Sequence, residues 1–153
     1  MIGRLYSIAE TEASVSTAHT FVEIASAADS VTLLERAWMG QSSFDTSENL
    51  EAKIMRIGVT GTGTALVPEP FQVGDAAFGG VCEVKATIEP TYTAVSELVI
   101  QGFNVLSGWL WTPANDDEVI VVSPSALVGI KLDVAPSGAM NFSFGCTFRE
   151  IGG

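Results

Sequence analysis

Apolar and polar residues alternate with a period of two along most of the chain, most clearly near its C-terminus. In the segment 140–149, Met140, Phe142, Phe144, Cys146 and Phe148 alternate with small or polar residues. Successive side chains of a strand point to opposite faces, so this spacing predicts a half-buried strand. The apolar members of this segment are therefore expected to face the core.

The preceding segment, 126–134, shows the same alternation. Val128, Ile130 and Leu132 share one face of it, and we expect that face to lie opposite the phenylalanines of 140–149. Pro136–Gly138 lies between the two segments. Proline presets a negative φ and glycine tolerates a positive one, so these residues predict a hairpin turn.

Further strands are predicted wherever β-branched or aromatic residues cluster between turn residues. They cover 4–9, 20–26, 31–39, 50–59, 81–87, 103–111 and 118–122. With the two C-terminal segments this makes about nine strands, which predicts a single all-β domain over 1–153, an antiparallel β sandwich or jelly-roll-like fold. The segment 93–102 has helical spacing, so at most one short helix is expected, and 60–64 and 74–80 are predicted loops.

Composition narrows the possible partners. The 153 residues are 47% hydrophobic and 16% charged, and 18 acidic against 7 basic residues give a net charge of −11. That charge has the wrong sign for binding a nucleic-acid backbone. The segment 1–7 lacks the features of a signal peptide, and no apolar run approaches the ~18 residues that span a bilayer. We therefore expect a soluble protein made in a cytoplasm, with no membrane or nucleic-acid partner.

Catalytic chemistry finds little support in the residues. The single histidine, His19, lies in a Ser- and Thr-rich stretch without a nucleophile motif, and a surface loop is the favoured interpretation. Gly61–Gly63 lacks the lysine of a phosphate-binding loop and is interpreted as a hairpin tip. No pair among the 18 carboxylates stands out for glycoside hydrolysis. The chain is therefore predicted not to be an enzyme and to have no catalytic residues.

Metal and cofactor sites are not expected either. Cys82 and Cys146 are 64 positions apart and have no neighbouring ligands, which excludes a zinc site. Both occupy apolar faces, so buried reduced thiols are favoured over a disulfide. The turn Asp116–Glu118 could hold a hard cation, although a solvated loop is the favoured interpretation.

Trp109 and Trp111 are the remaining aromatic candidates. They are two positions apart and so share one face of a strand. A sugar-stacking platform, a subunit interface and plain core all remain open, with core or interface favoured because Leu106 and Leu110 beside them are apolar.

Several segments together resemble a family of small, mostly uncharacterised β proteins encoded among the structural genes of tailed phages. The resemblance runs from end to end. The segments that carry it are Gly3–Ser7, Gly40–Ser43, Gly74–Gly80, Phe103–Val105 with Gly108–Trp109, Val121–Ser125 and Phe148–Gly153. The motifs are loop and strand patterns, so no catalytic residue can be carried over.

The resemblance implies a virion structural protein, and for so short a chain the leading role is a capsid decoration (cement) protein on the exterior of the head. Its expected partners are the major capsid protein and other copies of itself. The alternatives are a tail or neck component, or a carbohydrate-binding module that uses Trp109 and Trp111.

Self-association is expected on composition alone, because 47% hydrophobic residues and a mean hydropathy of +0.35 exceed what one small sandwich easily buries. A homotrimer is the first expectation. Aromatic residues are enriched in interface cores, and the candidate contacts are Leu5, Tyr6, Ile8, Trp109 and Trp111.

Overall fold

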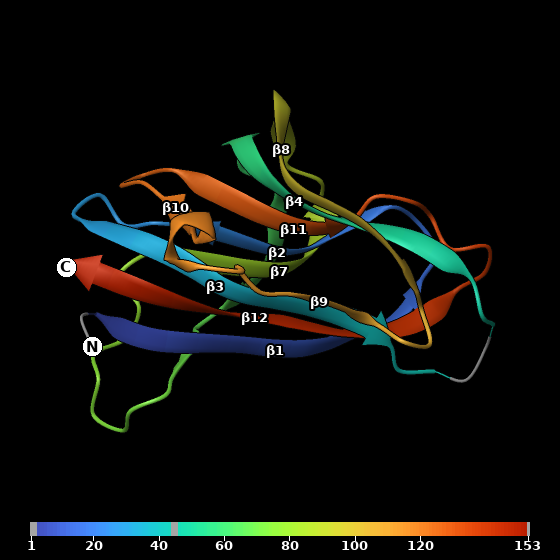
Figure 1. Ribbon diagram of the computed structural model, residues 1–153, viewed down its shortest axis with the longest axis horizontal. Coiled ribbons are helices and arrows are strands. Elements are labelled where there is room, and N and C mark those ends of the chain that lie inside the picture. The colour runs from blue at the N-terminus through green and yellow to red at the C-terminus, as the bar shows by residue number, and fades with distance from the viewer. Residues whose placement is uncertain (1–2, 44–45, 153) are drawn as a thin grey trace.

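Two antiparallel sheets pack face to face in the computed structural model, which describes residues 3–43 and 46–152 (Figure 1). Residues 1–2, 44–45 and 153, included in the predicted domain, lie outside this description. Sheet A has the strand order β10-β3-β12-β1-β6, with β9 also paired to β3. Sheet B has the order β5-β7-β2-β11-β4-β8. The predicted all-β antiparallel sandwich is confirmed.

The strand bounds extend most of the predicted segments. Sheet A contains β1 (Arg4–Val15), β3 (Ser30–Gln41), β6 (Glu69–Pro70), β9 (Trp109–Trp111), β10 (Ile120–Val122) and β12 (Met140–Gly152). Sheet B contains β2 (His19–Ala25), β4 (Asn49–Val59), β5 (Thr62–Leu66), β7 (Val81–Ile88), β8 (Thr91–Asn104) and β11 (Leu127–Leu132). Asp116–Glu118 forms a single 3-10 turn, η1. The segment predicted as one strand over 103–111 is divided, because Val105–Gly108 turns from β8 in one sheet to β9 in the other.

The core lies between the sheets, where the alternation predicted it. Met140, Phe142, Phe144 and Phe148 are buried on the inner face of β12. Val128, Ile130 and Leu132 are buried on β11 of the opposite sheet. Phe21 of β2 stacks on Phe144 with a centroid distance of 4.6 Å, which joins the two layers directly. The predicted inward faces of both segments are confirmed.

The predicted hairpin at Pro136–Gly138 is wrong. β11 pairs with β2 and β4, whereas β12 pairs with β1 and β3, so the turn passes from one sheet to the other. The alternation shows which face of a strand is buried but not which strand lies beside it. Two strands with apolar inner faces can pack across a core as well as side by side.

The helical spacing of 93–102 also has another cause. These residues belong to β8, the edge strand of sheet B, and a bulge separates the pair Tyr92↔Ile57 from the pair Glu97↔Met55. Val95 has a φ of +57° in this bulge and its side chain is 98% exposed. The bulge shifts the alternation of inward and outward side chains along β8. The apolar residues of 93–102 therefore have the spacing of a helical face, although they do not lie on one face.

Candidate interaction surfaces

The five predicted contact residues divide into a buried and an accessible group. Tyr6, Ile8 and Trp109 are buried in the core of a single chain, so the prediction that their side chains contact a neighbour is wrong. Inward positions of a strand and apolar contact positions have the same sequence pattern. Leu5 and Trp111 keep part of their surface exposed and lie on different strands, β1 and β9.

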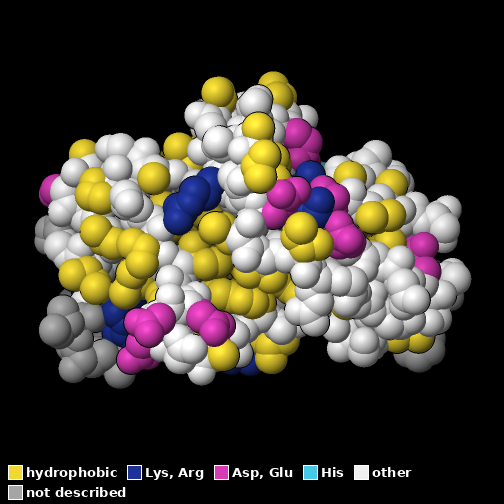
Figure 2. All heavy atoms as spheres, turned by 45° about the horizontal axis from the view of Figure 1, so that its top comes forward, with side chains coloured by type: hydrophobic (Ala, Val, Ile, Leu, Met, Phe, Trp, Pro, Cys, Tyr) yellow, Lys and Arg dark blue, Asp and Glu magenta, His cyan; other side chains and the backbone are white. Residues whose placement is uncertain are grey.

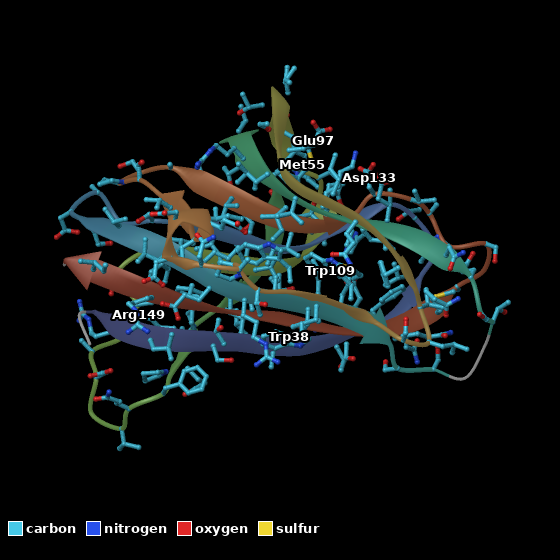
Figure 3. The ribbon with its side chains drawn as sticks, viewed as in Figure 1. Trp38, Met55, Glu97, Trp109, Asp133 and Arg149 are labelled. Carbon is cyan, nitrogen blue, oxygen red and sulfur yellow. The ribbon has the colours of Figure 1, made fainter. Side chains whose placement is uncertain are left out.

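Trp109 and Trp111 do not form an exposed aromatic platform. Trp109 is 3% exposed, and its Nε1 donates to Gln101 Oε1 at 3.2 Å. A partly exposed tryptophan that the sequence analysis missed, Trp38, lies on the outer face of sheet A, directly opposite Gly145 (Figure 3). A Cβ on Gly145 would overlap the Trp38 ring, so the ring packs over this glycine. The signal was present in the alternation, because Trp38 lies between the inward residues Ala37 and Met39.

A groove of about 440 Å³ opens along one side of the sandwich, between the edge strand β8 and the η1–β10 segment. We call it the β8 groove. Its lining is mostly apolar and includes Leu98, Val99, Trp111 and Ile120. Figure 2, in which this side is turned forward, shows hydrophobic side chains gathered in a hollow. Two charged residues, Arg56 and Glu118, also line it, and Arg56 Nη1 donates to the carbonyl of Val121 at 3.2 Å.

The connection between β5 and β7 carries a second apolar surface. Phe71 is 56% exposed and Val73 is fully exposed. We call Phe71–Val73 the apolar tip. The loop that contains it lies beside the N-terminal strand β1 in Figure 1. The amide of Phe71 donates to Leu5 O at 2.9 Å, one step beyond the pair Tyr6↔Pro70, so Leu5 and Phe71 lie opposite one another. The tip therefore extends the exposed part of Leu5.

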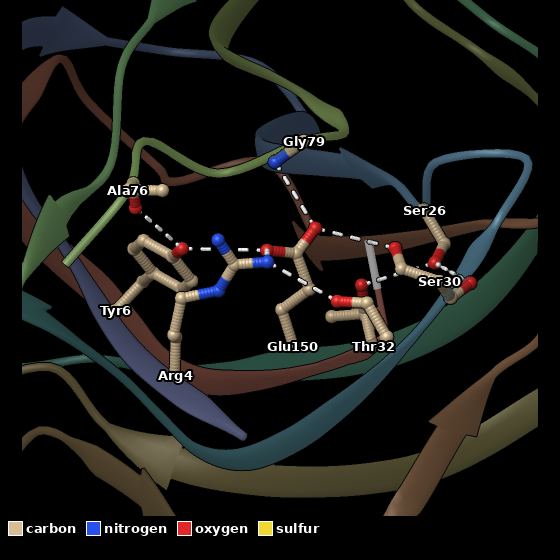
Figure 4. Close-up of polar contacts among 9 residues, drawn as sticks. Arg4, Tyr6, Ser26, Ser30, Thr32, Ala76, Gly79 and Glu150 are labelled. Atoms are coloured by element: carbon tan, nitrogen blue, oxygen red, sulfur yellow. Dashed lines mark hydrogen bonds and ion pairs between the residues drawn. The ribbon is translucent and has the colours of Figure 1, made fainter.

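A buried carboxylate, Glu150, holds the loop that carries the apolar tip (Figure 4). Its Oε1 accepts hydrogen bonds from Gly79 N at 3.0 Å and from Ser30 Oγ at 3.2 Å. Arg4 Nη2 forms an ion pair with Glu150 at 3.3 Å. Tyr6 donates at 2.8 Å to the carbonyl of Ala76 in the same loop. This buried network anchors the loop. The period of two places Glu150 on the same face as Phe148, so the alternation carried a signal of its burial that the sequence analysis missed.

His19 is not in a surface loop, and that prediction is wrong. It begins β2, its Nε2 lies 2.9 Å from Glu12 Oε2 of β1, and its Nδ1 lies 3.3 Å from Glu89 Oε1. Burial by itself lowers the pKa of His19, but the hydrogen bond to Glu89 and the charge of Glu12 outweigh it, and the pKa is raised. His19 therefore forms a link between the two sheets.

The glycine segment 61–63 is not a hairpin tip, because Thr62 begins β5, which pairs with β7 rather than with β4. The amide of Gly61 donates to Glu23 at 3.2 Å, and the amide of Gly63 donates to Glu83 at 2.9 Å. Carboxylates therefore already occupy the amide groups that a bound phosphate would need.

Both cysteines are buried and free, and burial raises the pKa of Cys82 and of Cys146. The described residues contain no group of three or more His, Cys, Asp or Glu side chains placed to hold a metal ion. In η1, Glu118 turns its carboxylate to Ala114 N and Asn115 Nδ2 rather than outward with its acidic neighbours.

Comparisons with protein-family models, with curated proteins and with solved structures found no match. In the described part of the chain, no helix is long and apolar enough to cross a membrane. Within the described residues, the β8 groove and the apolar tip are two apolar surfaces that suit contact with other proteins.

Proposed function

We propose that this protein is a virion structural protein of a tailed phage, a capsid decoration protein that binds the exterior of the head and stabilises it. The observation that carries the proposal is the exposure of apolar side chains at both edges of a rigid, acidic sandwich. Apolar surface held on a preformed scaffold suits contact with other proteins. The sequence resemblance to small proteins of tailed-phage structural genes supplies the biological setting.

The charge of the chain supports an outward position on the shell. A net charge of −11 repels the phosphate backbone of a packaged genome, so the outer surface of the head is the more favourable side. The major capsid protein is the proposed partner. Because few basic residues are available for ion pairs, apolar burial dominates this contact, and binding tolerates added salt.

The test is reconstitution on phage particles. Heads and tails are purified separately from the phage that encodes the protein, stripped of it, and incubated with purified labelled protein at low and high salt. Saturable binding to the exterior of heads, with little loss at high salt, supports the proposal. Binding to tails or necks replaces it with the alternative structural role, and absence of binding to any particle part overturns it.

A further inference from the structure

We infer that copies of this protein associate head to tail, with the apolar tip of one copy inserted into the β8 groove of the next. This inference goes beyond the proposed function, because it concerns contacts between copies of the chain and requires no capsid. It rests on the position, shape and charge of the two surfaces.

The tip of a chain cannot fill the groove of the same chain. The tip continues from β6 at one edge of sheet A, whereas β10 borders the groove at the opposite edge, and three strands lie between them. Four strand spacings of about 4.8 Å separate the two edges by roughly 19 Å. Contact between the surfaces therefore needs a second copy.

The two surfaces are complementary in form. The tip projects the exposed side chains of Phe71 and Val73 from a loop that Tyr6 and Glu150 hold in place. The groove offers about 440 Å³ lined by Leu98, Val99 and Trp111, within the size range of pockets that enclose apolar groups. Because both surfaces are preformed, little conformational entropy is lost on association.

Their charges also match. Arg56 and Glu118 both line the groove, but the Glu118 carboxylate accepts from Ala114 N and Asn115 Nδ2. Among the described residues no carboxylate forms an ion pair with Arg56. Glu69 is exposed on β6 and, two positions before Phe71, points to the same face of the strand. Two chains of net charge −11 repel one another, so this opposite pair helps to set the register of the contact.

A contact between two different surfaces of the same chain is heterologous. Such contacts close into rings when the rotation between copies permits and otherwise form open chains. Self-association through a strand edge, such as β8 against β8, would instead be isologous, with the same surface on both sides. The two arrangements respond differently to mixed variants.

The experiment mixes two variants that each lack one surface. Phe71→Asp removes the tip, and Leu98→Asp places a charge in the groove; each variant alone should be monomeric by light scattering while the wild type forms oligomers. Mixed together, the two should form a discrete 1:1 dimer, because the first still has a groove and the second still has a tip. Val59→Asp, at a 61% exposed valine outside both surfaces, is the control and should assemble as the wild type does.

A charge exchange tests the register. Arg56→Glu should weaken association about tenfold, because it replaces an attraction with a repulsion, and adding Glu69→Arg should restore most of the loss. Circular dichroism on each variant verifies that it is folded. Any of three outcomes would overturn the inference. The wild type stays monomeric at its highest soluble concentration, both surface variants still form oligomers, or the mixture of the two variants stays monomeric. None of these outcomes depends on particle binding, so they are distinct from failure of the proposed function.

Discussion

Phe144 of β12 stacks on Phe21 of β2 across the core, with a centroid distance of 4.6 Å, and both rings are buried. Replacing Phe144 by alanine removes an aromatic contact between the sheets and leaves a cavity. We expect Phe144→Ala to lower the free energy of unfolding by about 3 to 5 kcal/mol, measured by denaturant titration. Leu110→Ala, at an exposed position of β9, is the control and should change it by less than about 0.5 kcal/mol. An equal effect of the two would contradict the core position of Phe144.

His19 gives the stability a defined dependence on pH. Its pKa in the folded protein is raised above 6.5, so its contribution is complete below pH 6.5 and is lost as the pH rises through the folded value. Burial raises the pKa of Glu89, but hydrogen bonds from His19 and Thr20 outweigh this and lower it below 4.5. The contribution of Glu89 is therefore present above pH 4.5 and is lost as the pH falls through its folded value.

We therefore expect the difference in unfolding free energy between the wild type and His19→Gln to be largest in mildly acidic solution, between these two transitions. Urea titrations of both proteins from pH 4 to pH 9 measure it. Glu35→Gln, which removes a carboxylate that pairs with Arg149 rather than with His19, should show no such window. A difference that grows steadily toward alkaline pH would contradict the assignment.

At the scale of elements, Glu150 couples the strand β12 to the loop that bears the apolar tip. Glu150→Gln keeps the shape of the side chain, and its amide oxygen can still accept from Gly79 and Ser30 at the Oε1 position. Those bonds are weaker without the carboxylate charge, and an NH₂ group replaces the Oε2 that pairs with Arg4. We expect a loss of about 1 to 3 kcal/mol in unfolding free energy. Hydrogen exchange should accelerate in 71–79 and not in β11, and uniform acceleration would show that the loop is not anchored separately.

The alternation of residues predicted faces well and neighbours poorly. It placed Phe142 and Ile130 on inner faces correctly, because burial of one face is a property of a single strand. It could not show that β11 and β12 belong to different sheets, because pairing depends on which strands meet after the chain crosses the core. The bulge at Val95 interrupted the period itself, so β8 imitated a helix.

The interaction surfaces were harder to predict than the fold for a related reason. Aromatic residues such as Tyr6 and Trp109 are common in interface cores and also in protein cores. The local sequence does not distinguish these two environments. Phe71 and Val73 lie in a segment without periodicity, so no pattern marked them as contact residues. Both side chains are exposed, and hydrogen bonds of Glu150 and Tyr6 hold the loop that presents them.

The whole molecule is built from pairings distant in sequence. Among the described strands no two consecutive ones pair, and the nearest ladder in sequence joins Leu66 to Cys82. Loop closure must therefore precede nearly every stabilising contact, which slows folding.

We expect the main refolding phase, followed by stopped-flow tryptophan fluorescence after dilution from denaturant, to take milliseconds to seconds. Proline isomerisation among the six prolines adds a phase of tens of seconds, and a double-jump experiment with brief unfolding removes that phase while leaving the main one unchanged. A main phase completed in microseconds would contradict this topology, because contacts so distant in sequence cannot form that quickly.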